Sequence, residues 1–124
     1  MENIIFVCCG GVKIRFRLNR SGTALQLLSI LPLQAKVQRW GGEIYFPIPL
    51  DARLEQGKEL LEVGDIAFWP PGQALCIFFG PTPASTDHRP RAAGPVTVVG
   101  HIARQKDIGQ LRKIKQGQAI SLIT

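Results

Sequence analysis

The feature that most constrains the fold is a pair of short apolar runs joined by a Trp-Pro-Pro-Gly corner. The runs occupy residues 66–69 and 74–79 and contain no charged side chain. Successive side chains of a strand point to opposite faces, so strands that are apolar on both faces must be covered on both. Gly-Pro-Thr-Pro follows the second run. We therefore interpret this segment as a pocket wall as well as part of a core.

Alternation of apolar and charged residues predicts a hairpin at the start of the chain. Residues 3–9 and 12–18 are rich in strand-forming residues and flank a Gly-Gly pair. In the second run Lys13, Arg15 and Arg17 alternate with apolar side chains, which is typical of a strand with one wet face.

Turn and cap signals divide the rest of the chain into short elements. We expect a helix capped by Ser21 or Thr23 and ended by Pro32, strands at 35–40, 43–46, 96–102 and 119–123, and a helix at 107–114. Segments 47–62 and 80–95 are rich in turn-forming residues and are expected to be irregular. About eight strands and two short helices predict an all-β sandwich or barrel, and a closed antiparallel barrel would leave no exposed strand edge.

Composition is that of one globular domain over residues 1–124. The chain is 45% hydrophobic and 19% charged, and a domain of this length needs neither disulfides nor a metal. Its three cysteines do not form a disulfide framework, and no apolar run is long enough to span a membrane. Glu2 stands where a signal peptide would carry a basic residue. We expect a cytoplasmic protein with no membrane partner.

The net charge of +6 raises the alternative of nucleic-acid binding. Basic residues gather in segments 13–17 and 104–115. The sequence lacks zinc-finger spacing, an RNP motif and a GXXG loop, and the first basic group is simply the polar side of an alternating strand. We interpret both groups as solvated faces and consider nucleic acid an unfavoured partner.

Three segments resemble the cyclophilin-like proteins of unknown function, a family of small bacterial and archaeal domains. They read WGGEIYF at Trp40–Phe46, GDIAFWPPGQALCIFFGPTPAS at 64–85 and PVTVVGHI at 95–102. The resemblance covers most of the chain. It implies a closed, eight-stranded antiparallel β-barrel with two short helices, distantly similar to the cyclophilins that isomerise X-Pro bonds.

The resemblance to true cyclophilins also indicates where an isomerase site would lie. Their catalytic arginine occurs in a Phe-His-Arg segment, which here corresponds to Val37-Gln38-Arg39. Their Gln-Phe-Phe-Ile strand corresponds roughly to residues 76–79, with Cys76 in place of the glutamine and Phe78 as a pocket aromatic. Because two polar groups are replaced, enzyme activity is left open, with Arg39 as the catalytic candidate.

The favoured function is binding of a small molecule or an extended X-Pro peptide in an apolar cleft, without strong catalysis. Peptidyl-prolyl isomerisation is the first alternative and nucleic-acid binding the second. The candidate binding residues combine aromatic rings, a carboxylate and a small apolar side chain: Trp40, Glu43, Tyr45, Trp69, Cys76 and Phe78. His88 and His101 lack metal-ligand spacing, so no metal and no cofactor is expected. An apolar strand edge would permit a homodimer.

Overall fold

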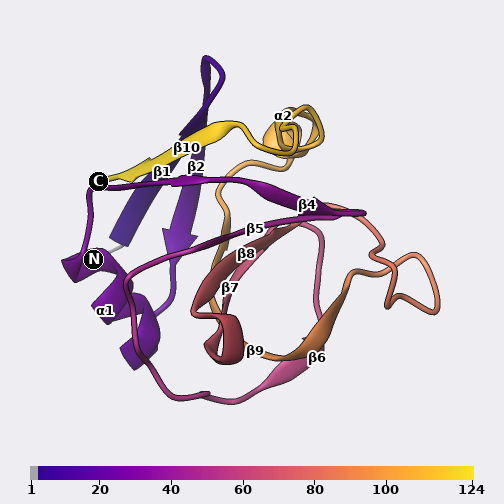
Figure 1. Cartoon of the computed structure of the whole chain (residues 1–124), viewed down its shortest axis with the longest axis horizontal. Helices are drawn as coiled ribbons and strands as arrows, with labels where there is room; N and C mark the ends of the chain where they lie inside the picture. Colours follow the sequence, from indigo (N-terminus) through magenta and orange to yellow (C-terminus); the bar gives the residue numbers. More distant parts are fainter. Residues whose placement is uncertain (1–2) are drawn as a thin grey trace.

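The computed structural model describes residues 3–124 as one curled antiparallel sheet with two short helices (Figure 1). Its elements are β1 (Asn3–Cys9), β2 (Val12–Leu18), α1 (Gly22–Ser29), β3 (Leu33–Lys36), β4 (Gln38–Trp40), β5 (Glu43–Pro47), β6 (Lys58–Leu60), β7 (Asp65–Trp69), β8 (Ala74–Phe78), β9 (Arg91–Ile102), α2 (Ile108–Leu111) and β10 (Ala119–Ile123). Single 3-10 turns cover Pro70–Gly72 and Gln105–Asp107. Strand order is β3-β10-β1-β2-β9-β7-β8-β5-β4, and β6 pairs with β9.

The all-β prediction is confirmed, but the strand count is ten over the described residues rather than eight. Val37 splits the strand expected at 35–40. Its main-chain groups hydrogen-bond to those of Gln118 and Gly117, whereas β3 before it pairs with β10 and β4 after it pairs with β5. β3 and β4 are the two ends of the sheet, and no ladder joins them in the part of the chain described. The covalent chain at Val37 therefore connects the two end strands, and the predicted closed barrel is not formed by strand pairing alone.

Two segments expected to be irregular contain strand structure. β6 lies within 47–62, and β9 already begins at Arg91, so the long loop is shorter than predicted. The first residues of β9 pair with β6, whereas later ones pair with β7 and β2. The helix expected at 107–114 is reduced to one 3-10 turn and the four-residue α2. The turn signals were real, but pairing between β6 and β9 overrode them.

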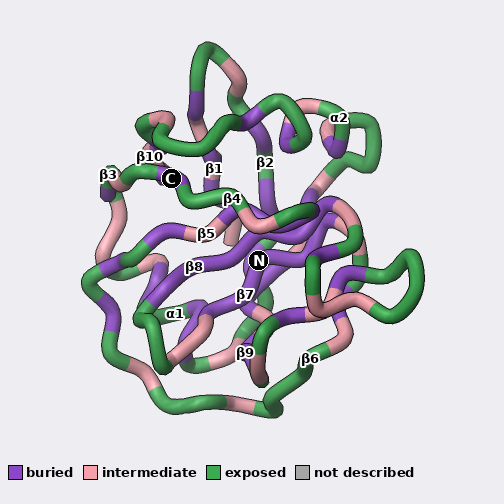
Figure 2. Tube along the Cα trace, turned by 45° about the vertical axis from the view of Figure 1, so that its right-hand side comes forward, coloured by how far each residue is buried: buried purple, intermediate pink, exposed green. Residues whose placement is uncertain are grey.

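Burial divides the sheet into an inner and an outer face. The main core fills the inner face and includes Ile44, Phe68 and Phe79. A second, smaller cluster lies on the outer face of β7 and β8, beneath the start of β9: Leu61, Ala67, Cys76, Phe78, Ala92 and Val96. Figure 2 shows β7 and β8 buried throughout most of their length, as expected for strands covered on both sides, while the loop after β8 is largely exposed.

Local chemistry fixes the ends of these elements. Gly10 and Gly11 both have positive φ, 56° and 81°, which a tight hairpin turn requires and other residues rarely adopt. Ser21 caps α1, because its Oγ accepts a hydrogen bond from the main-chain N–H of Ala24. Gly42 lies against the backbone of Gly80, where any Cβ would overlap the carbonyl carbon. This contact holds the turn between β4 and β5 against the end of β8.

Candidate functional site

A half-open cavity of about 150 Å³ lies on the outer face of the sheet. Its walls come from β4, β5, β7, β8 and the first part of β9: Trp40, Glu43, Tyr45, Trp69, Cys76, Ala92, Ala93 and Val96. The structure therefore brings together five of the six predicted binding residues. Phe78 is fully buried within the smaller cluster and does not line the cavity.

Strand pairing explains why these side chains meet. Trp40 pairs with Glu43 across β4 and β5, and Tyr45 pairs with Cys76 across β5 and β8. Directly paired residues project from the same face of a sheet, and residues two apart on one strand share that face. Glu43 and Tyr45 consequently flank each other on the outer face, with Trp40 and Cys76 beside them.

Gly72 packs closely against Trp69 in the cavity wall, and Gly94 lies beside the indole. A Cβ added to Gly72 would lie 2.6 Å from Cζ3 of the indole, and one added to Gly94 would lie 3.6 Å from its Nε1. Gly72 belongs to the 3-10 turn that the two prolines begin, so the corner packs directly on the indole ring. The Trp-Pro-Pro-Gly corner thus makes a fixed aromatic wall that costs little entropy to keep in place.

Glu43 is the unusual group in the lining. It is 5% exposed, and its Oε1 has no hydrogen-bond partner among residues 3–124. Loss of solvent raises the pKa of this carboxyl to about 7, while the Cys76 thiol opposes the shift by hydrogen bonding. A buried carboxyl without a full set of partners is costly, and one with a raised pKa that lines a cavity is a candidate functional group.

Cys76 is suited to packing rather than to nucleophilic attack. Burial raises the pKa of its thiol well above the ordinary value, and the Glu43 carboxylate raises it further. The thiolate is the reactive form of cysteine, and it is suppressed here. Cys76 therefore contributes a small apolar surface and a weak hydrogen-bond donor to the cavity.

Arg39 does not reach this cavity. It pairs with Ile44, whose side chain is on the inner face, so alternation directs Arg39 and its neighbour Trp40 to opposite sides. Its Nη1 donates hydrogen bonds of 2.8 and 2.9 Å to the carbonyl oxygens of Arg112 and Ile114. The guanidinium also lies 5.0 Å from the centre of the Phe79 ring. Arg39 is thus occupied in fixing the chain after α2 to the sheet.

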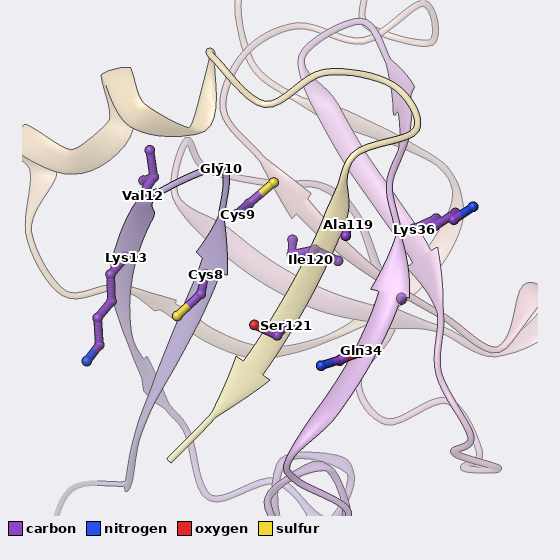
Figure 3. A pocket seen from close by; sticks show the side chains of 12 residues that line it. Cys8, Cys9, Gly10, Val12, Lys13, Gln34, Lys36, Ala119, Ile120 and Ser121 are labelled. Atoms are coloured by element: carbon purple, nitrogen blue, oxygen red, sulfur yellow. The ribbon is translucent and has the colours of Figure 1, made fainter.

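A larger and shallower depression of about 730 Å³ lies near the tip of the β1–β2 hairpin (Figure 3). Figure 3 shows Cys8 and Cys9 pointing to opposite sides of β1, as the strand alternation predicts, and Lys13 and Lys36 extending in different directions. No side-chain polar atom lining it is both buried and without a partner in the described chain. We therefore place the candidate site in the smaller cavity.

The fold also gathers Glu62, Asp65 and His101, a group that sequence spacing did not indicate. Their potential ligand atoms lie within 4.8 Å of one another. Asp65 Oδ1 is 2.8 Å from Nδ1 of His101, and Oδ2 accepts the main-chain N–H of Glu62 at 2.9 Å. Pairing of β7 with β9 creates this contact, so only the register could have revealed it. Because both Asp65 oxygens are used, the group is explained as a hydrogen-bond network.

The basic face of β2 is exposed, as its alternation predicts. Lys13 Nζ lies 4.6 Å and the Arg15 guanidinium 5.5 Å from the centre of the Phe6 ring. The ring is therefore covered by the chain's own cations rather than left free to stack on a base. Nucleic-acid binding, a homodimer and a cytoplasmic location remain predictions. No helix in the described residues is long and apolar enough to cross a membrane.

The curled sheet and its outer cavity define a small β protein of cyclophilin type. The chain belongs to the cyclophilin-like family, whose family model matches residues 3–123. Among solved structures it is similar to the hypothetical protein AF2241 from Archaeoglobus fulgidus, with 29% sequence identity, coverage of 98% of this chain and 94% of that one, and a TM-score of 0.81. No curated protein matches the chain. The resemblance inferred from the three sequence segments is confirmed.

Proposed function

We propose that this chain binds a small molecule in the cavity between Trp40 and Trp69. The observation that supports it most is Glu43, a residue that lines the cavity, is 5% exposed and has a buried Oε1 without a hydrogen-bond partner in the described chain. The arrangement costs stability in the free protein, and a ligand that donates a hydrogen bond to this carboxyl group would recover part of that cost. The aromatic and small apolar walls then hold the rest of the ligand.

The size of the cavity limits what can enter it. A volume of about 150 Å³ lies below the roughly 300–1,000 Å³ of sites for drug-sized ligands. It matches a benzene-sized group, because an engineered cavity of about that volume binds benzene. An extended X-Pro peptide could place only one side chain inside, so a compact small molecule is the better occupant.

Binding without strong catalysis also agrees with the chemistry of the lining. The Cys76 thiol is held in its protonated form, and the ionisable group beside it, Glu43, raises the pKa of the thiol instead of lowering it as an activating partner would. The isomerase alternative needs an arginine at the proline pocket, whereas Arg39 bonds to main-chain carbonyls on the other face. We therefore do not propose prolyl isomerisation.

The two tryptophans of the chain provide a direct test, since both line the cavity. We would record the two indole N–H signals in ¹H–¹⁵N correlation spectra during a screen of compact neutral, cationic and anionic fragments and an Ala-Pro peptide. At least one fragment should shift both signals with a sub-millimolar Kd. Saturable shifts from the Ala-Pro peptide alone would favour the peptide alternative.

A matched pair of exposed alanines separates site binding from surface binding. Ala93→Leu fills the mouth of the cavity, whereas Ala119→Leu makes the same change elsewhere on the surface. The first variant should lose the fragment and the second should keep it. If no fragment shifts either indole signal, or if both variants bind equally, the proposed function is wrong.

A further inference from the structure

The charges around the cavity are unlike those of the chain as a whole. The chain carries 15 Lys and Arg against 9 Asp and Glu, yet the lining contains one carboxyl, Glu43, and no Arg, Lys or His. The other buried side-chain atom without a partner in the described residues, Nε of Arg91, belongs to a residue outside the lining. An anionic ligand would meet only the carboxyl, so the lining selects against it.

Three aromatic side chains surround the same space. Trp40, Tyr45 and Trp69 reach it from β4, β5 and β7. The faces of aromatic rings carry negative potential and attract cations within about 6 Å, most strongly for tryptophan. Aromatic rings combined with a carboxylate form the kind of cage that recognises alkylated ammonium groups.

A metal ion does not satisfy this lining. Only Glu43 and Cys76 offer the carboxylate or sulfur ligands that metals prefer, and a bound zinc ion generally has four ligands. The remaining walls are alanines, a valine and the aromatic rings, which would strip water from a metal ion without replacing it. An organic cation differs, because its alkyl surface gains from apolar walls while its charge is spread over the whole group.

We propose that the ligand of this cavity is a small organic ammonium ion, with its charge paired to Glu43 and its alkyl groups against Trp40, Tyr45 and Trp69. This inference rests on the proposed function and specifies its ligand class. The cation supplies the charge partner that the buried carboxyl lacks, and the volume of about 150 Å³ accommodates a compact alkylammonium head. The raised pKa of Glu43 agrees with an acid whose counter-charge arrives with the ligand.

The test compares choline with 3,3-dimethylbutan-1-ol, its uncharged isostere, by titration of the full chain at pH 8 followed through the two indole signals. Choline should bind at sub-millimolar concentration and at least tenfold more tightly than the isostere. Glu43→Gln keeps the shape of the side chain and should weaken choline at least tenfold while leaving the isostere nearly unchanged. Glu59→Gln makes the same charge change at an exposed position and should leave both affinities as they are.

A second variant removes an aromatic wall. Trp69→Leu should weaken choline at least fivefold, and its fold can be checked by the remaining indole signal and the amide spectrum. Equal binding of choline and its isostere would overturn the ammonium inference while leaving a small-molecule site intact. Failure of choline beside a successful neutral or anionic fragment would also overturn it. Failure of every compound, choline included, would overturn both this inference and the proposed function.

Discussion

Replacing Glu43 by glutamine should raise the free energy of unfolding relative to wild type, and this gain should be larger at pH 8 than at pH 4. In the folded protein the pKa of Glu43 is about 7, whereas its ordinary value is 4.5. Below pH 4.5 the group is protonated in both the folded and unfolded states and contributes no difference. Between pH 4.5 and 7 the unfolded chain releases this proton and the folded chain retains it, so stability falls as pH rises. Above pH 7 the loss is complete.

The size of this loss follows from the pKa difference. A shift of about 2.5 units corresponds to roughly 3 kcal/mol, at about 1.4 kcal/mol per unit. Screening by solvent reduces it little, because the side chain is 5% exposed. The Cys76 thiol, whose pKa burial raises well above its ordinary value, stays protonated at both pH values and adds nothing to the difference. Contributions from carboxylates elsewhere cancel in the comparison of wild type with variant.

Urea unfolding of wild type and Glu43→Gln at pH 4 and pH 8 measures this effect. The free-energy advantage of the variant should grow by roughly 3 kcal/mol between the two pH values. Glu59→Gln removes an exposed carboxylate and should show no comparable growth. An advantage of Glu43→Gln that is the same at both pH values, or that shrinks toward pH 8, would refute the reasoning.

Three further predictions concern other parts of the molecule. Arg39→Met should lower the free energy of unfolding, measured in urea, by about 1–2 kcal/mol, because charged hydrogen bonds to the chain after α2 are lost. The variant should bind choline as wild type does; weaker binding by the folded variant would show that Arg39 contributes to the site. Glu55→Gln should destabilise the protein at neutral pH and lose this effect as pH falls, because hydrogen bonds from the first residues of α1 lower the pKa of that carboxyl; a pH-independent effect by urea unfolding would contradict this. Iodoacetamide should alkylate Cys8, which is half-buried, before the buried Cys76 with its raised pKa, as read by mass spectrometry of timed samples; the reverse order would show that the outer layer opens.

Local sequence chemistry predicts much of this fold. The hairpin at 3–18, the cap at Ser21 and the strands around the Trp-Pro-Pro-Gly corner all follow from alternation and turn residues. β6 was missed because its three residues carry no apolar pattern and are a strand only through pairing with β9. The same pairing converts the end of the expected loop into strand, and no local signal encodes such long-range contacts.

The candidate site was predictable in its residues but not in its chemistry. Alternation alone puts Glu43 and Tyr45 on one face, and it also separates Arg39 from Trp40, although both were predicted to belong to the candidate site. Whether Phe78 or Phe79 faces the outer side of the sheet depends on the register of β8. The missing partner of Glu43 Oε1 could not be foreseen, because burial and hydrogen bonding depend on how β9 closes over the sheet.

The most direct test of this account is the pKa of Glu43 itself, measured from the side-chain carboxyl ¹³C shift during a pH titration with and without saturating choline. We expect a pKa of about 7 for Glu43 in the free protein, and a clearly lower pKa when the cation pairs with the carboxylate. A pKa of about 4.5 in the free protein would show that the Glu43 carboxylate does not lack hydrogen-bond or charge partners. An elevated value unchanged by choline would show that the cavity does not bring an ammonium ion to Glu43.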